Sequence, residues 1–130
     1  MRTQITVLHP SGHQVKTTVE LPERPKYGDL SNVMRRFLGE YTDHRGQVVS
    51  ELMEHATALV DGEKRDMFIC QLGGFKMKGR PPLPVNDQAT TLYRRPGVNG
   101  LTHINGPAVL FERKVWPPFR EVEAVERGEI

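Results

Sequence analysis

The sequence predicts a single α+β domain with a β-grasp-like order of elements, β-β-α-β-β-α-β, and a mixed sheet. Three observations lead to this prediction. Two alternating runs flank a Pro-Ser-Gly turn, a segment of helical periodicity follows them, and later alternating runs are interrupted by a second, shorter helical segment. The 130 residues suit one domain of ordinary size. We expect residues 1–116 to form this domain and residues 117–130 to be a flexible acidic tail.

The clearest predicted element is an N-terminal β-hairpin. Ile5 and Val7 share one face of the run 3–9, and the run 14–21 carries Val, Thr, Val and Leu at every second position. The Pro-Ser-Gly sequence between the runs is strong turn chemistry. Two alternating runs around a short turn indicate a hairpin with one buried face.

A helix is predicted next, over residues 29–38. Apolar residues recur there at helical spacing, and Arg35 and Arg36 lie on the opposite side. Asp29 is the expected N-cap and Gly39 the expected stop. We expect the apolar stripe of this helix to cover the buried face of the hairpin.

The rest of the chain predicts three strands and a short helix. Residues 40–51 are weakly patterned, so we expect a loop with a partial strand around 48–49. An Asp-Gly pair joins the next two strands, and the second of them is apolar on both faces, which is typical of an interior strand. The predicted ranges are strand 53–60, strand 66–72, helix 87–95 and strand 108–112.

Composition excludes several classes of protein. The single cysteine, Cys70, excludes an internal disulfide and a zinc site made of cysteines alone. No apolar run approaches the roughly 20 residues that cross a bilayer, and the first residues do not resemble a signal peptide. We therefore expect a cytoplasmic protein with no membrane partner. Because Phe68, Ile69 and Leu72 surround Cys70, we interpret it as a core residue rather than a nucleophile.

Charge is distributed unevenly along the chain. The formal net charge is +2, yet residues 121–130 carry four Glu and one Arg. The segment 76–95 carries five Lys and Arg residues against Asp87 alone. Such a basic segment is either an anion-binding surface or a solvated surface.

Three stretches of the second half carry distinctive motifs: EHATALVDGEKRDMFI at 54–69, KGRPPLPVNDQATTLYR at 78–94 and NGPAVLFE at 105–112. They resemble an uncharacterised domain family of small bacterial, phage and plasmid proteins. Members of this family join a DMF strand to a KGLP…N…AT…YR segment and close with GPAVLF. The present sequence departs from this pattern by its longer proline stretch at 80–84. The resemblance implies an accessory protein of a phage, plasmid or bacterial genome, and it implies no reaction.

The candidate binding site lies in the basic segment. A Gly-Gly pair opens a loop with cationic residues, and the helix that follows begins after Asn86. Free backbone N–H groups at a helix start favour anions. The predicted ligand-binding residues are Lys78, Arg80, Asn86, Thr90 and Arg94. The alternative is structural: a solvated loop, a capping Asn86 and an Arg94 that interacts with the helix C-terminus.

Enzyme signatures are weak in this sequence. No paired carboxylates, triad spacing, cofactor loop or metal-ligand set stands out, and a turn separates His9 from His13 without further ligands beside them. The sequence predicts no catalytic residue, no metal and no cofactor. It favours a small non-enzymatic binding module whose partner, an anionic small molecule or a protein, is unknown. The alternatives are a binder of an anionic or nucleotide ligand through 76–95, a weak nucleic-acid binder, and a hydrolase with a His beside a nucleophile.

Overall fold

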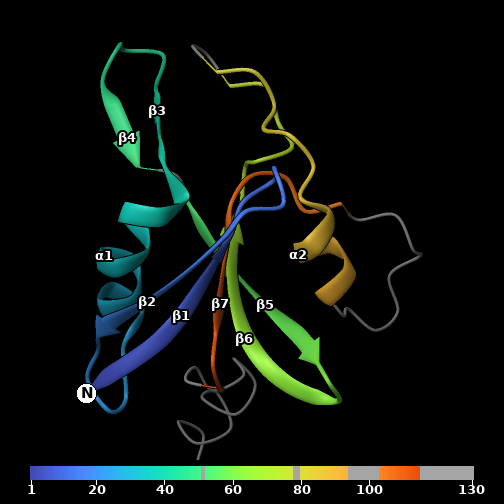
Figure 1. The fold of residues 1–130 in the computed structure, drawn as a ribbon. Coiled ribbons are helices and arrows are strands. Elements are labelled where there is room, and N and C mark those ends of the chain that lie inside the picture. The colour runs from blue at the N-terminus through green and yellow to red at the C-terminus, as the bar shows by residue number, and fades with distance from the viewer. Residues whose placement is uncertain (51, 78–79, 94–102, 115–130) are drawn as a thin grey trace, which may run out of the picture.

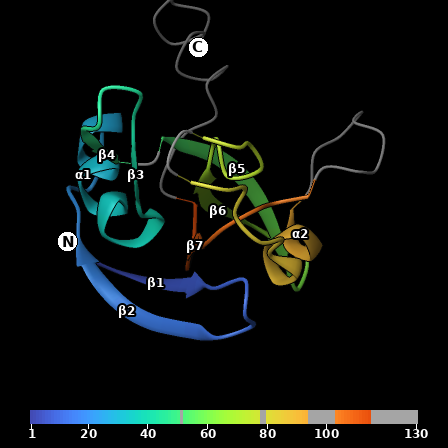
Figure 2. The ribbon, with the colours of Figure 1, turned by 90° about the horizontal axis from the view of Figure 1, so that it is seen from above.

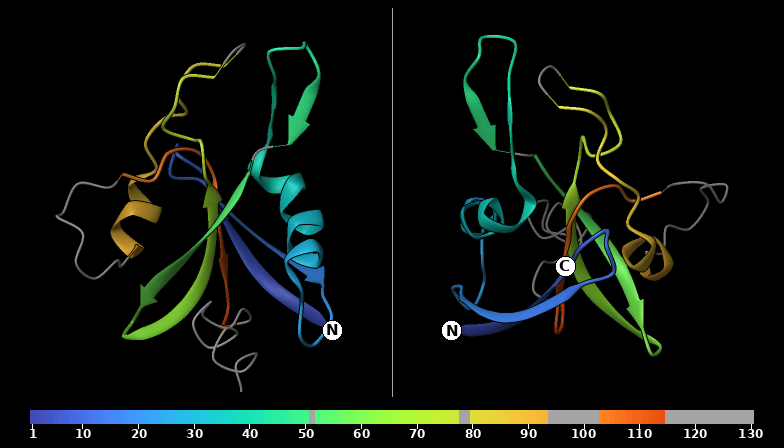
Figure 3. Two further views of the ribbon diagram at one scale, coloured as in Figure 1. Left: turned by 180° about the vertical axis from the view of Figure 1, so that it is seen from behind. Right: turned by 45° about the horizontal axis from the view of Figure 1, so that its top comes forward.

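A twisted five-stranded sheet with a helix on each side forms the centre of the molecule, in a computed structural model that describes residues 1–50, 52–77, 80–93 and 103–114 (Figure 1). A separate two-stranded hairpin projects beyond one helix (Figure 3). The elements, in chain order, are β1 (Arg2–Leu8), β2 (Gln14–Glu20), α1 (Tyr27–Leu38), β3 (Glu40–Thr42), β4 (Val48–Ser50), β5 (Met53–Val60), β6 (Glu63–Cys70), α2 (Asp87–Leu92) and β7 (Ala108–Phe111). The predicted domain boundary at residue 116 and the predicted tail 117–130 lie outside the described residues.

The sheet is antiparallel throughout, so the predicted mixed sheet and β-grasp-like arrangement are wrong. Its strand order is β2-β1-β7-β6-β5. The last strand lies between the first hairpin and the second, and Leu110 is paired with Thr6 on one side and Met67 on the other, both antiparallel. Strand direction depends on the path by which the chain enters β7, and alternation within the strand carries no information about that path.

The first hairpin confirms its prediction. Strands β1 and β2 pair antiparallel with Val7 opposite Val15, and Ile5 and Val7 are buried. Gly12 closes the turn at a φ of 94°, which a residue with a Cβ rarely adopts. The alternating pattern of the sequence thus identified both the strands and their buried face.

Helix α1 covers one face of the sheet. Leu30, Val33, Met34 and Leu38 pack in a core that receives side chains from all five strands. The helix begins at Tyr27, so Asp29 is its third residue rather than its N-cap, and the Asp29 carboxylate accepts the N–H of Lys26 at 2.9 Å. Its closest contacts are with β7, β6 and β5 rather than with the hairpin alone. The strands that arrive later in the sequence therefore complete the surface that α1 covers.

Helix α2 packs on the opposite face, as Figure 2 shows from above. Ala56, Ala58 and Ala108 on the strands face Ala89 on the helix, and these small side chains allow α2 to approach the sheet closely. The helix ends at Leu92, earlier than predicted, and Tyr93 follows as its C-cap. The prediction that β6 is apolar on both faces is confirmed, because the neighbours Met67 and Phe68 belong to the two opposite cores.

Residues 40–50 form a β-hairpin where a loop with a partial strand was predicted. Strands β3 and β4 pair with Tyr41 opposite Val49. The Asp43 carboxylate holds the turn by accepting the N–H groups of Arg45 at 2.8 Å and Gln47 at 3.0 Å. A turn of this kind stabilises short strands that have little periodicity of their own.

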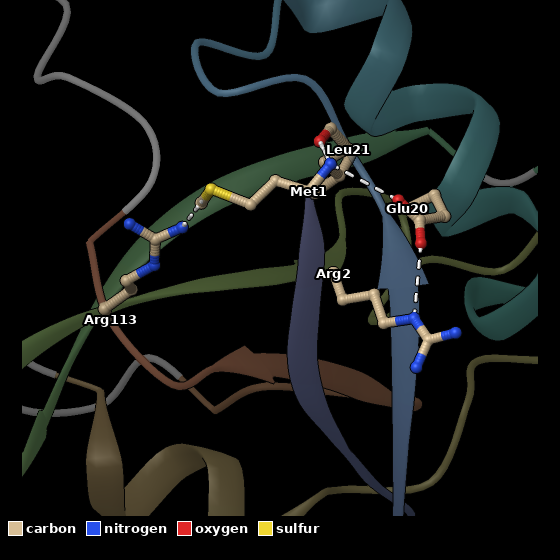
Figure 4. A network of polar contacts seen from close by, with 5 residues as sticks. All are labelled: Met1, Arg2, Glu20, Leu21 and Arg113. Atoms are coloured by element: carbon tan, nitrogen blue, oxygen red, sulfur yellow. Dashed lines mark hydrogen bonds and ion pairs between the residues drawn. The ribbon is translucent and has the colours of Figure 1, made fainter.

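The N-terminus is tied to the end of β2 (Figure 4). The Met1 ammonium group donates to Leu21 O at 2.9 Å and to the Glu20 carboxylate at 3.3 Å, and Arg2 lies 3.6 Å from the same carboxylate. The Arg113 guanidinium donates to the Met1 sulfur at 3.8 Å. The two ion pairs are exposed and contribute little to stability, so the contacts mainly order the start of β1.

Candidate functional site

Asn86, one of the predicted binding residues, lies fully buried between α2 and the sheet. Its Oδ1 accepts the N–H of Ala89 at 3.1 Å, which confirms its predicted role as the cap of α2. Its Nδ2 donates to Leu8 O at 2.8 Å and to Gly106 O at 2.9 Å. Both amide hydrogens are thus engaged, and the side chain links α2, β1 and the segment before β7.

Thr90 belongs to the same network. Its hydroxyl donates to Asn86 O at 2.8 Å and accepts the N–H of Ile104 at 2.9 Å. The N–H of Asn86 in turn donates to Ile104 O at 2.7 Å. These contacts anchor the chain before β7 to α2, so the structure gives Thr90 and Asn86 structural partners.

Arg80 lies apart from this network. Its Nη2 donates to Leu72 O at 3.2 Å, and its guanidinium carbon lies 5.7 Å from the centroid of the Tyr41 ring. Arg80 therefore connects its loop to the β3–β4 hairpin. The other two predicted binding residues, Lys78 and Arg94, lie outside the described residues. Of the five predicted residues, the structure brings together Asn86 and Thr90.

Cys70 is buried, as predicted for a core residue. It belongs to the core beneath α1, and its thiol donates to Leu38 O at 3.4 Å. The last turn of α1 covers the Cys70 sulfur and shields it from a bulky reagent. Reactive thiols, by contrast, are exposed to solvent at least in part.

A buried His-Asp pair was missed by the sequence reasoning. The Nε2 atom of His55 on β5 lies 2.7 Å from Oδ1 of Asp66 on β6, and Asp66 is fully buried. The His55 ring also packs against Phe68 at 5.3 Å between centroids. The Asp-Gly turn in the sequence carries a signal for this pair. Counting residues outward from the turn pairs Thr57 with Asp66, and His55 lies diagonally across from Asp66, two residues from Thr57 along β5. Within the described ranges no hydroxyl or thiol is hydrogen-bonded to His55.

The described residues form a groove of about 520 Å³ on the α2 side of the sheet. We call it the sheet groove. Every strand of the five-stranded sheet contributes to it, and α2 forms part of one wall. Its lining residues are Gln4, Thr6, Leu8, Gln14, Lys16, Val60, Arg65, Leu92, Leu110 and Glu112.

Polar and apolar groups alternate over the sheet groove. Lys16 stands opposite Thr6 in the register of the first hairpin, and Thr6 stands opposite Leu110. The Gln14 side chain donates to that of Gln88 on α2, which joins the hairpin to the helix. The Nε atom of Arg65 donates to Phe111 O at 2.5 Å, which holds the guanidinium over β7. The groove thus presents one held cation, Arg65, and one exposed cation, Lys16, beside an apolar floor.

A smaller hollow of about 180 Å³ lies beside the Cys70 end of β6. Its lining residues include Glu54, Ile69, Phe75, Tyr93, His103 and Ile104. None of the residues that line it lines the sheet groove, so the two hollows are separate sites.

No three His, Cys, Asp or Glu side chains of the described part of the chain lie close enough to hold a metal ion together. Among the helices in that part, none is both long and apolar enough to cross a membrane. No family model matches the chain, and neither the curated proteins nor the solved structures include a significant match. The function is therefore inferred from the geometry of the hollows.

Proposed function

We propose that the protein is a small, non-enzymatic binding module that holds an anionic ligand with an apolar body in the sheet groove. One observation carries this proposal. Helix α1 spans one face of the sheet, whereas the six-residue α2 covers only part of the other, and a groove lined from all five strands stays open beside it. A twisted sheet face with an open groove is a preformed concave surface, as ligand sites usually are.

The chemistry of the lining determines the ligand class. Lys16 and Arg65 supply two positive charges, and Glu112 supplies one negative charge. Leu8 and Leu110 provide apolar floor between them. A carboxylate or phosphate that carries an apolar group satisfies both features, because the anion forms charge-assisted hydrogen bonds while its body covers the half-buried Val60 and Leu92 that also line the groove.

This proposal moves the expected anion site from segment 76–95 to the sheet groove. Arg80, Asn86 and Thr90 bind other parts of the fold and line neither of the two hollows, whereas Lys16 and Arg65 line the sheet groove, Arg65 with one nitrogen bonded to Phe111 O. A nucleic acid is the weaker candidate, because none of the described lining residues is aromatic and single strands are held by stacking on aromatic rings. The single Cys70 suits a reducing compartment, so the proposal includes a cytoplasmic location and the accessory role that the family resemblance implies.

The test uses charged fragments and their uncharged counterparts. Benzoate and phenyl phosphate are titrated into ¹⁵N-labelled protein beside benzamide and benzyl alcohol, and amide shifts are followed by NMR. The proposal expects the anions to shift the amides of Thr6, Lys16 and Leu110 and the neutral compounds to shift them less.

A pair of matched variants separates the groove from general surface charge. Lys16→Glu reverses a charge inside the groove, and Lys64→Glu makes the same change on β6, where alternation with the groove residue Arg65 places it on the opposite face. Lys16→Glu is expected to weaken anion binding about fivefold or more, and Lys64→Glu to leave it nearly unchanged. Equal loss in both variants would reduce the effect to net charge and contradict the proposal.

A further inference from the structure

The smaller hollow beside β6 contains a combination of side chains that the sheet groove lacks. Two aromatic residues, Phe75 and Tyr93, and one carboxylate, Glu54, line it together with His103. Ile69 and Ile104 supply apolar surface to the same hollow. We call it the aromatic hollow, and the inference below does not depend on the function proposed for the sheet groove.

Glu54 brings a negative charge to this hollow. It lies on β5 opposite Ile69 of β6, whose side chain belongs to the core beneath α2, so both residues point to the α2 side of the sheet. Within the part of the chain that the structure describes, its carboxylate forms no ion pair. Glu54 is exposed, so water screens its carboxylate and its attraction for a cation is modest, and the aromatic and apolar lining of the hollow supplies the rest of the recognition.

Two rings border the same space. Tyr93 is held in place by its backbone, whose N–H donates to Ala89 O at 3.0 Å and which bridges to Ala58 on β5. Phe75 follows a turn closed by its N–H to Leu72 O at 3.1 Å, and its side chain is 62% exposed. Aromatic faces attract ammonium and guanidinium groups by cation–π interaction.

The size of the hollow limits the ligand. Its volume of about 180 Å³ is below the roughly 300–1,000 Å³ of pockets that hold drug-sized molecules. It has room for one side chain or one short alkyl group. A metal ion is a poor fit, because one carboxylate and one imidazole do not complete a set of oxygen or nitrogen ligands.

We propose that the aromatic hollow binds an alkylammonium group, with the charge at Glu54 and the alkyl chain against Phe75 and Tyr93. Such a group is carried by a small free amine or by a lysine side chain of a protein partner. The same groups of the hollow would bind either ligand: a carboxylate attracts the charge, the aromatic faces contact the cation and its CH₂ groups, and the apolar floor contacts the alkyl chain.

The first experiment compares n-butylammonium with n-butanol, which has the same chain and no charge. Each is titrated into ¹⁵N-labelled protein, with the expectation that butylammonium shifts the amides of Glu54, Ile69 and Tyr93 and that butanol binds more weakly. A peptide with one lysine between glycines and serines, and the same peptide with acetyl-lysine, then distinguish the sources. Tighter binding of the lysine peptide than of butylammonium assigns the hollow to a protein partner, and the reverse assigns it to a free amine.

Variants decide whether the hollow itself is responsible. Glu54→Gln keeps the shape of the side chain and removes its charge, and Glu63→Gln makes the same change at the exposed start of β6. The proposal expects Glu54→Gln to weaken butylammonium binding about fivefold and Glu63→Gln to leave it unchanged. Phe75→Leu keeps the apolar surface without the ring and is expected to weaken the ammonium more than the alcohol.

The results of these experiments test the aromatic hollow independently of the sheet groove. Equal binding of butylammonium and butanol, or unchanged binding in Glu54→Gln, overturns the proposal. Because the two hollows share no lining residue, Lys16→Glu is expected to leave butylammonium binding intact. Failure of the anion test and failure of the ammonium test are therefore independent results.

Discussion

The two faces of the five-stranded sheet differ in what covers them. The α1 face lies under a 12-residue helix and buries large side chains, among them Phe68 and Phe111, whose rings meet edge to face at 5.4 Å between centroids. The α2 face has small residues under a six-residue helix and polar residues beside it. Both faces carry a buried core, but the α1 core holds the larger side chains, and the α2 face leaves the sheet groove open beside its helix.

The contrast is already present within single strands. On β1, Ile5 and Val7 face α1 and are buried, while Gln4 and Thr6 on alternate positions line the sheet groove. The Phe68 side of β6 packs beneath α1, while Arg65 reaches the groove. Adjacent residues of one strand thus lie on opposite faces of the sheet. The same substitution made at two neighbouring positions therefore compares the stability contributed by the two faces.

The largest effect is expected from a charge on the α1 face. Val7→Asp places an unpaired carboxylate in the core, where Val7 is 3% exposed, and we expect it to lower the free energy of unfolding by several kcal/mol. Thr6→Asp puts the same group next to it on the groove side and is expected to cost under about 1 kcal/mol. Urea unfolding followed by circular dichroism measures both. Similar losses in the two variants would show that the faces do not differ as described.

A smaller loss is expected from Asn86, which holds α2 to the sheet. Asn86→Ala removes its three side-chain hydrogen bonds and leaves buried carbonyls of Leu8 and Gly106 without that partner, so we expect a loss of roughly 2–4 kcal/mol. Asn32→Ala, on the exposed side of α1, is the control and is expected to change stability by no more than about 0.5 kcal/mol. Chemical unfolding again gives the comparison. An Asn86→Ala protein of normal stability would contradict the structural role of these three hydrogen bonds.

The reactivity of Cys70 measures how completely α1 covers the core beneath it. Cys70→Ala is expected to lower the free energy of unfolding by about 1 kcal/mol, because the loss is one buried sulfur. In the native wild-type protein a thiol reagent is expected to react far more slowly than in the urea-unfolded protein. Rapid labelling of the native state would show that the α1 face opens readily and would revive a reactive role for the thiol.

The smallest effect on stability is expected on the open face. Lys16→Glu changes an exposed lining residue of the sheet groove and is expected to change the free energy of unfolding by no more than about 0.5 kcal/mol, even as it weakens anion binding. Thermal unfolding without ligand measures the first quantity, and the NMR titration measures the second. A marked loss of stability would mean that the groove residues belong to the scaffold.

Much of the candidate site was beyond prediction from the sequence. Asn86 was correctly predicted as a helix cap, because a cap bonds a residue three positions away. Its two other partners lie 78 and 20 residues away, and no local pattern announces them. The sheet groove likewise combines residues from Gln4 to Glu112. The concentration of charge in the sequence pointed to segment 76–95, although the cations that line the sheet groove are Lys16 and Arg65.

The sequence by itself determined the features that depend on local periodicity: the first hairpin and its buried face, the apolar stripe of α1, the two-sided β6 and the burial of Cys70. Such features follow from the spacing of side chains along one element. Tertiary structure decided the antiparallel insertion of β7 between β1 and β6, the His55–Asp66 pair and the opening of the groove beside α2. These depend on which distant strands become neighbours, and that choice is made by the packing of the whole sheet rather than by any segment alone.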